Sequence, residues 1–302
     1  MRIGDLTAAE YGFLLLTSNL GNPGRKPLTV AQFRELTDRA GRILSRGIER
    51  DVNVQDFVSV GYSHGFAEHI VALLQEEELL AWYMTQAGKH CCVPITRATE
   101  SYPLILRKRL GTDSPGCLWA KGDLGLLDTP AIALVGSREL NPRNRDFARE
   151  VGRQAALQGL TLVSGNARGA DKAAQNACLE AGGRVISVVA DSLTIHRSKE
   201  NVLYLGENSF DEEFSAQRAL SRNRCIHALG RIVFVAQADF GKGGTWDGTV
   251  KNLHHGWSPV VCFRDGSEAA AELEQMGAYL IGTEDLNDFC ALQKTEKTLF
   301  TM

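Results

Sequence analysis

Apolar and polar positions follow two different periods along this chain, and the change of period divides the sequence. Over residues 1–97 apolar residues recur at helical spacing, first after a Thr7-Ala-Ala-Glu10 capping box, again from Thr29, and then through Ala67–Gln86. From Ala131 to about Gly282, short runs of Val, Ile and Leu alternate with amphipathic segments. The pattern predicts a small all-helical domain followed by alternating strands and helices.

The second region is expected to form a parallel sheet covered by helices. Strands are predicted at 131–135, 160–163, 184–190, 231–236, 258–263 and 278–281, and helices at 143–158, 169–181, 211–229, 246–256 and 267–276. Nearly continuous apolar strands are typical of parallel strands buried on both faces, so we expect an α/β fold, a Rossmann-like three-layer sandwich with a mostly parallel sheet. The expected domains are a helical N-terminal domain, a Rossmann-like domain with a connector at 98–130, and a C-terminal tail, at residues 1–97, 98–282 and 283–302.

Two of the predicted strands end abruptly in small residues and a cation. The first is followed by Gly136, Ser137 and Arg138, and the second by Ser164, Gly165, Arg168 and Gly169, with Asp171 close behind. The carboxyl ends of parallel strands meet at one edge of a sheet, and glycines there allow a ligand to approach the backbone closely. Because arginine pairs with phosphate, the pattern predicts an anion site at this edge.

Two further segments are expected at the same edge. The helix before the fourth predicted strand carries Arg222, Asn223 and Arg224, and the glycine-rich loop after that strand contains Lys242, Gly243, Gly244 and Thr245. Backbone amides of such a loop can seat a phosphate. Any one of these glycine turns is equally well an ordinary turn between a strand and a helix, and only their convergence favours a ligand site.

Composition limits the class of protein. The chain has 302 residues, 44% of them hydrophobic, and a net charge of −3, so nucleic-acid binding would require a local basic patch. Residues 136–172 hold seven Arg or Lys against four Asp or Glu. The seven cysteines have no Cys-x-x-Cys spacing, which indicates free thiols in a reducing compartment, and no metal or cofactor is expected. With no apolar signal core at Met1–Leu6 and no membrane-spanning run, a cytoplasmic protein without membrane contact is expected.

Neither common nucleotide-binding motif is complete. The chain lacks Gly-x-x-x-x-Gly-Lys-Ser/Thr, and Arg138–Pro142 occupies the turn where Gly-x-Gly-x-x-Gly would stand. Tightly bound ATP or NAD is therefore not the leading interpretation. Several arginines combined with exposed amides suit a protein that grips a sugar-phosphate backbone without cutting it.

These segments together resemble the DNA processing protein A (DprA/Smf) family. The resemblance is carried by Val135-Gly-Ser-Arg, Val163-Ser-Gly-Asn-Ala-Arg-Gly-Ala-Asp, Ser221-Arg-Asn-Arg and Gly243-Gly-Thr, and extends from about Glu100 to Gly266. It implies a non-enzymatic, cytoplasmic homodimer that binds single-stranded DNA and loads a RecA-type recombinase in DNA recombination and natural transformation. The family's phosphate-binding positions fall on Gly136, Ser137, Arg138, Ser164, Gly165, Arg168, Gly169, Arg222, Asn223, Arg224, Gly243 and Thr245.

The chain departs from the family pattern at two places. Asp191–Glu200 replaces the usual Tyr-Pro element after the third strand, and Trp246 and Asp247 stand where small residues are usual. Trp246 is either a stacking platform for a base or a core aromatic at a helix start. One alternative function is a nucleotide sensor or nucleotide-hydrolysing enzyme of the same superfamily, in which Asp247 would polarise a glycosidic bond. A second alternative is a scaffold for protein interactions.

Overall fold

A computed structural model describes residues 6–44 and 51–292. The contacts divide the chain into two compact units, each formed from three segments. The helical unit contains Met1–Tyr102, Pro115–Trp119 and Asn208–Phe210, and the Rossmann-like unit contains Pro103–Ser114, Ala120–Glu207 and Asp211–Met302. Within the described ranges, no helix is long and apolar enough to cross a membrane.

Within the described part of the helical unit there are five helices and the first strand. They are α1 (Ala8–Thr17), α2 (Val30–Leu44), α3 (Val54–Ser59), α4 (His64–Leu74), α5 (Glu77–Lys89) and β1 (Val93–Thr96). The capping box is present as predicted, since the Thr7 amide donates to Glu10 Oε2 at 2.8 Å and the Glu10 amide donates back to Thr7 Oγ1 at 3.3 Å. Both caps satisfy amides that a helix start leaves without partners.

The single helix predicted over Ala67–Gln86 is wrong, because the chain breaks between α4 and α5. A buried arginine explains the break. The Arg25 guanidinium donates to the carbonyls of Leu15 and Ser18 at the end of α1, and it lies 3.5 Å from the Leu73 carbonyl at the end of α4. It also pairs with Glu76, which precedes α5. The Arg25 side chain thus caps the ends of both α1 and α4, and no local sequence pattern predicts this capping.

The nine strands found among the described residues form one sheet in the order β1-β2-β6-β5-β4-β3-β7-β8-β9. The bounds after β1 are β2 (Cys117–Lys121), β3 (Ala131–Val135), β4 (Thr161–Ser164), β5 (Arg184–Val188), β6 (Val202–Glu207), β7 (Val233–Val235), β8 (Val260–Phe263) and β9 (Tyr279–Ile281). From β6 to β9 every neighbouring pair is parallel. The predicted α/β fold with a mostly parallel sheet and N-terminal helices is therefore confirmed.

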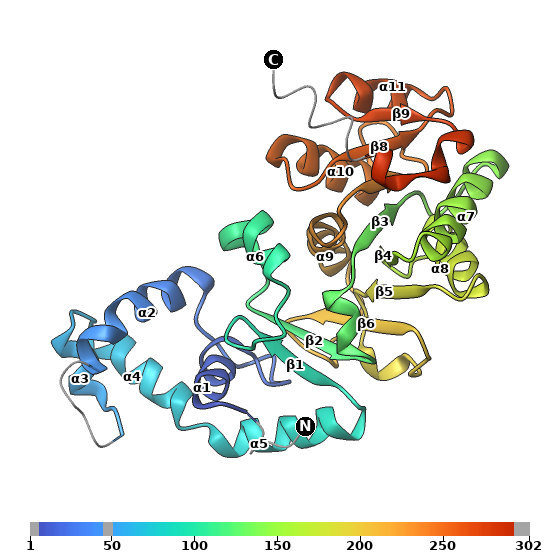
Figure 1. The fold of residues 1–302 in the computed structure, drawn as a ribbon. Helices are drawn as coiled ribbons and strands as arrows, with labels where there is room; N and C mark the ends of the chain where they lie inside the picture. Colours follow the sequence, from blue (N-terminus) through green and yellow to red (C-terminus); the bar gives the residue numbers. More distant parts are fainter. Residues whose placement is uncertain (1–5, 45–50, 293–302) are drawn as a thin grey trace. The chain divides into compact units, whose positions relative to one another are not determined.

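Helices cover both faces of this parallel sheet, with α7 and α8 on one side of β3 and α9 on the other (Figure 1). The helices of the Rossmann-like unit are α6 (Leu104–Leu110), α7 (Pro142–Leu157), α8 (Ala170–Glu180), α9 (Ala216–Leu229), α10 (Gly243–His255) and α11 (Glu268–Gln275), with short 3-10 turns at Gly111–Asp113, Leu124–Asp128, Leu193–Ile195 and Thr283–Asn287. From β3 the chain passes to β4 on one side, and it returns later to β7 on the other side. Loops after β3 and β7 therefore diverge, which opens a crevice at the strands' carboxyl ends.

Periodicity did not predict β1, β2 and β6. In β2 the charged Lys121 interrupts the apolar pattern, but its ammonium is buried and lies 3.3 Å from the Leu193 carbonyl. β6 ends in Gly206 and Glu207, and Glu207 is buried because Arg224 pairs with it. In both strands a polar partner distant in the sequence permits a charged residue inside the sheet.

Helices α7 and α8 pack so closely that their backbones touch at a glycine. A β-carbon built on Gly152 of α7 would lie 2.0 Å from the Ala174 carbonyl oxygen of α8. Gly12 of α1 is also a glycine inside a helix, yet a β-carbon there would meet nothing within 4 Å. Comparison of the two glycines therefore distinguishes the effect of close helix packing on stability from the effect of helix propensity.

We expect opposite effects from the same substitution at these positions. Gly152→Ala lowers the free energy of unfolding by about 1–3 kcal/mol, because α7 and α8 must separate. Gly12→Ala raises it by about 0.5–1 kcal/mol, because alanine loses less entropy in a helix. Urea unfolding of the two variants, followed by circular dichroism, measures both, and a Gly152→Ala protein as stable as the wild type would contradict the close packing.

Candidate functional site

Two connected hollows lie at the carboxyl edge of the parallel strands. The large hollow has a volume of about 800 Å³ and the small hollow about 210 Å³. Both are lined by Arg138, Ala167, Arg168, Phe214 and Arg222. The crevice expected from the strand order is therefore present, and its shared wall carries three arginines.

Most of the residues predicted for the site line one hollow or the other. Those lining the large hollow are Gly136, Ser137, Arg138, Arg168, Arg222, Asn223, Lys242, Gly243, Gly244 and Thr245, and Gly165 lines the small one. Ser164, Gly169 and Arg224 line neither. Ser164 is buried and accepts a hydrogen bond from Gln175 Nε2 at 2.8 Å, which is a structural role within the sheet edge.

Gly169 brings two turns together behind the hollows. Its φ of +81° suits glycine, and a β-carbon there would lie 2.3 Å from the Ser137 carbonyl oxygen. Arg224 of α9 does not line the hollows. It pairs with Glu207 at 2.8 Å and donates to the Asp113 carbonyl at 2.9 Å. The Arg-Asn-Arg run thus supplies one hollow-lining guanidinium, from Arg222.

Arg222 is the buried cation of the site. It is 7% exposed, its Nη1 donates to the Val188 carbonyl at 2.8 Å, and its Nε has no hydrogen-bond partner among the described residues. Burial lowers the pKa of this guanidinium, while the carboxylates of Asp171 and Asp191 act in the opposite direction. Both hollows therefore border a cation whose hydrogen-bonding capacity is not used up.

The turn after β4 is built around this guanidinium. A β-carbon on Gly165 would lie only 1.5 Å from Arg222 Nη1, so the absence of a side chain makes room for the arginine. Asp171 Oδ2 accepts hydrogen bonds from the amides of Gly165 and Ala167, each at 3.1 Å. Burial raises the pKa of Asp171, and the charge of Arg222 opposes this shift. Asp171 thus holds the turn in place and balances the buried cation.

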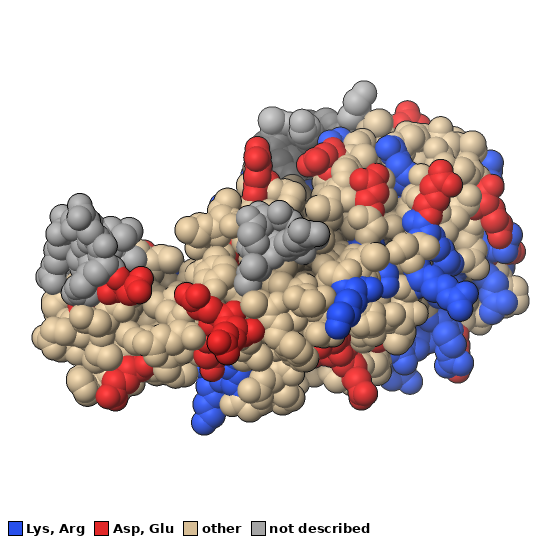
Figure 2. Space-filling view, turned by 90° about the horizontal axis from the view of Figure 1, so that it is seen from below, with Lys and Arg blue, Asp and Glu red and all other residues tan. Residues whose placement is uncertain are grey.

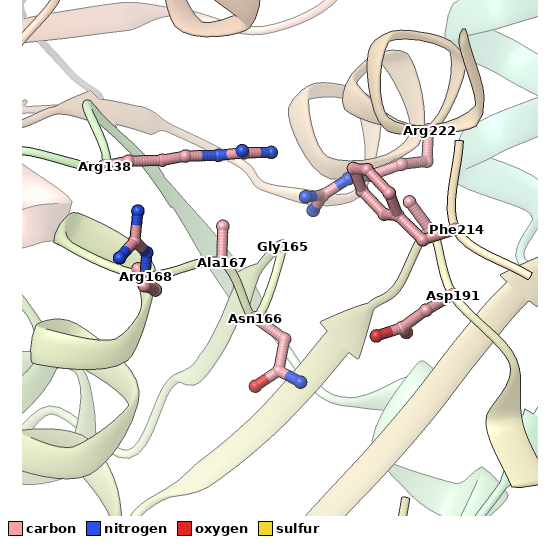
Figure 3. A pocket seen from close by; sticks show the side chains of 9 residues that line it. Arg138, Gly165, Asn166, Ala167, Arg168, Asp191, Phe214 and Arg222 are labelled. Carbon is pink, nitrogen blue, oxygen red and sulfur yellow. The ribbon is translucent and has the colours of Figure 1, made fainter. Parts of the chain in front are cut away.

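Two exposed arginines complete the cationic wall. Arg138 and Arg222 extend toward one another above the Gly165–Ala167 turn, and Arg168 lies beside Arg138 (Figure 3). The Arg138 guanidinium carbon lies 5.9 Å from the centre of the Phe214 ring, within reach of a cation–π contact. The wall thus combines one fixed and two exposed positive charges, an arrangement suited to a phosphate-bearing ligand.

The glycine-rich loop contributes a helix start. α10 was predicted from 246, but it begins at Gly243, so Gly243–Thr245 form its first turn and line the large hollow. No side chain caps this helix through Lys242, and Asn223 Nδ2 donates to the Gly244 carbonyl at 3.0 Å. Trp246 packs edge-on against Phe240 at 5.0 Å, and Asp247 pairs with Lys251 at 2.8 Å. Neither Trp246 nor Asp247 lines a hollow.

Five residues of the small hollow were not predicted: Asn166, Ala167, Ala190, Asp191 and Phe214. Asp191 stands in the segment that departs from the family pattern, and that departure was the available signal. Phe214 fell inside the helix predicted over 211–229, whereas α9 begins at Ala216 and leaves Phe214 in a loop, 54% exposed. Because the helix was predicted to start five residues too early, Phe214 was not recognised as an aromatic residue that lines the hollows.

The basic surface is local, as the net charge of −3 requires. On the face shown in Figure 2, Lys and Arg side chains gather toward the side of the Rossmann-like unit that carries α7 and α8. Helix α7 alone has four exposed arginines, at Arg143, Arg145, Arg149 and Arg153. Positive charge thus continues outside the hollows.

Comparison with protein-family models gives a match over most of the chain. The model described as DNA recombination-mediator protein A matches residues 94–291. The chain belongs to this family. The DNA processing protein A resemblance drawn from the motifs is confirmed, and the recombination-mediator match includes every residue that lines the two hollows.

Individual relatives agree with this assignment. The DNA processing protein DprA of Streptococcus pneumoniae is 35% identical over 141 residues, which is 43% of this chain and 50% of that protein. Protein Smf of Escherichia coli is 33% identical over 178 residues, 55% of this chain and 46% of that protein. The chain spans about half the length of these curated relatives.

Solved structures share the recombination-mediator fold. DprA of S. pneumoniae superimposes with a TM-score of 0.63 at 24% identity, over 86% of this chain and 97% of that one. DNA processing protein A of Helicobacter pylori, whose structure was studied for its single-stranded DNA binding mode, gives a TM-score of 0.55 at 25% identity, over 68% and 96% of the two chains. The first of these similarities concerns the fold alone.

The fit between Gly165 and Arg222 predicts a strong coupling. Gly165→Ala places a methyl group on the guanidinium and lowers stability, whereas the same substitution in an Arg222→Ala background meets no guanidinium. In a double-mutant cycle we expect a coupling free energy of about 1 kcal/mol or more, measured by urea unfolding. Additive effects of the two substitutions would show that the guanidinium does not occupy the space beside Gly165.

Proposed function

We propose that this chain is a non-enzymatic single-stranded DNA-binding protein of the DNA processing A type. In this proposal it acts in DNA recombination, as a homodimer that loads a RecA-type recombinase onto the bound strand. The observation that carries it is the convergence of Arg138, Arg168 and Arg222 on the turn after β4, next to the uncapped start of α10.

The chemistry of these groups fits a sugar-phosphate backbone. Arginine side chains neutralise phosphates, and helix-start amides with a glycine at their side allow the strand to lie close to the protein. The exposed ring of Phe214 offers a surface on which an unpaired base can stack. A duplex keeps its bases paired inside, so this combination favours a single strand.

Membership of this family supports the proposal that the chain binds single-stranded DNA. The H. pylori relative has a described single-stranded DNA binding mode, and its solved chain is covered almost completely by this one. Recombinase loading and dimer formation are proposed from the family alone. They are tested by assembly of a RecA-type filament on coated single strands with and without the protein, and by analytical ultracentrifugation.

The DNA-binding proposal predicts a specific loss at Arg138. Arg138→Ala should weaken binding to a labelled single-stranded oligonucleotide at least tenfold, because the variant neutralises fewer phosphates. The slope of log affinity against log salt should become shallower by about 0.7 for each phosphate that is no longer neutralised. Fluorescence anisotropy over a salt series measures both quantities, with a duplex of the same sequence expected to bind more weakly.

The matched control is Arg153→Ala. Arg153 also carries one positive charge, but it is exposed on α7, pairs with Glu150 at 2.6 Å and lines neither hollow. We expect the affinity of Arg153→Ala for the single-stranded oligonucleotide to stay within about twofold of the wild type, since one charge outside the hollows is largely screened. Absence of single-strand binding by the wild type, or equal losses in the two variants, would refute the proposal.

A further inference from the structure

Helix α7 carries a line of arginines along one face. Arg145, Arg149 and Arg153 follow one another at helical spacing, so they lie on the same face, and all three are exposed. Arg149 lies 3.9 Å from Glu180 of α8, which shows that this face turns toward α8. The chain as a whole has a net charge of −3, so the line of cations is a local feature and not a consequence of overall composition.

The three arginines differ in how far carboxylates neutralise them. Arg153 donates two hydrogen bonds to the Glu150 carboxylate, at 2.6 and 2.8 Å, and these lower the pKa of Glu150. Arg149 only approaches Glu180, and both side chains are more than half exposed. Arg145 forms no ion pair with any residue that the structure describes. The positive charge that remains for a ligand is therefore concentrated at Arg145 and Arg149, in the first half of α7.

The start of α7 adjoins the large hollow. Asn141 lines that hollow, and α7 begins at the next residue, Pro142. The Arg145 amide donates to the Asn141 carbonyl at 2.9 Å, so Arg145 stands one helical turn beyond the wall of the hollow. Arg149 follows one turn later, about 6 Å further along the helix axis. The two cations thus continue outward from the hollow in one line.

This line suits the backbone of a single strand. A spacing of about 6 Å is close to that of neighbouring phosphates in an extended strand, and each guanidinium can pair with one phosphate. The exposed face of α7 offers no ring on which a base could stack, because Phe147, the one aromatic residue of the helix, is fully buried. Since the line begins at the hollow wall, the strand held in the hollow is the ligand that it meets first.

Resting on the DNA-binding function proposed above, we propose that the single strand leaves the large hollow over Asn141 and continues along α7, where Arg145 and Arg149 each neutralise one further phosphate. This contact involves the backbone alone, so it lengthens the footprint on DNA without selecting a sequence. Arg145 and Arg149 thus form a second binding surface, outside both hollows.

The experiment compares a short with a long strand, using labelled thymidine oligonucleotides of about six and about fifteen nucleotides in fluorescence anisotropy. Arg145→Ala/Arg149→Ala should bind the short strand within about twofold of the wild type, but the long strand about fivefold or more weakly. For the long strand, the slope of log affinity against log salt should become shallower by about 1.4, which is about 0.7 for each of two phosphates.

A second measurement uses the wild-type protein alone, so it does not depend on how the variant folds. The flanks of the long strand are made either abasic, which keeps the phosphates, or with methylphosphonate linkages, which keep the bases but carry no charge. We expect abasic flanks to retain most of the affinity of the long strand. Methylphosphonate flanks should reduce it toward that of the short strand, because α7 contacts phosphates only.

Arg143→Ala/Arg153→Ala is the matched control. It removes the same number of charges from the same helix, but the Arg143 guanidinium lies over the Phe263 ring of β8 at 5.9 Å, and Arg153 is paired with Glu150. Neither residue lines a hollow. We expect the affinity of this variant for the long strand to stay within about twofold of the wild type.

The outcomes separate the two proposals. Loss of long-strand affinity in both double variants, or in neither, overturns the continuation along α7 and leaves binding in the hollows intact. An affinity that follows the bases of the flanks instead of their phosphates overturns it as well. Failure of the wild type to bind any oligonucleotide overturns the DNA-binding function itself. A loss confined to long strands and to Arg145→Ala/Arg149→Ala supports the second surface.

Discussion

The carboxyl edge of this sheet depends on the burial of one guanidinium. Arg222 enters from α9, reaches the end of β5 through the Val188 carbonyl, and lies where a side chain on Gly165 would otherwise be. Burying a charge costs several kcal/mol unless partners offset it. Asp171 supplies the opposite charge and also holds the amides of the turn, so one carboxylate stabilises both the arginine and the backbone around it.

This arrangement separates fixed from adaptable charge. Arg222 is held by packing on several sides, whereas Arg138 and Arg168 stand at the exposed rim of the same hollows. A fixed cation loses little side-chain entropy when a ligand arrives, and rim cations can adjust to the path of a flexible chain. The combination suits a ligand that repeats one charged unit, such as a polynucleotide backbone.

The segments that distinguish the small hollow are loops at the strand ends. Asp191 follows β5 and Phe214 precedes α9, and neither belongs to the motifs that carry the family resemblance. Loops tolerate change because the sheet beneath them is stabilised separately, so one fold can keep its arginines at the strand ends while the rest of the lining varies. The Asp191 side chain would otherwise be free to turn on its loop. Its hydrogen bond to His196, whose ring stacks on Tyr204, fixes its orientation.

The sequence by itself determined the class of fold, most of the parallel strands and the edge at which the glycines and arginines converge, because burial on both faces and turn chemistry leave local patterns. It missed β2 and β6, whose charged residues are paired with distant partners, and it joined α4 to α5 because Arg25 acts from outside both helices. Only the tertiary structure decided which arginine of α9 faces the hollows, since Arg222 and Arg224 differ by the partners that Asp171 and Glu207 provide. Long-range electrostatic pairing leaves no periodic trace in a sequence, and that is why the finer chemistry of the site became visible only in three dimensions.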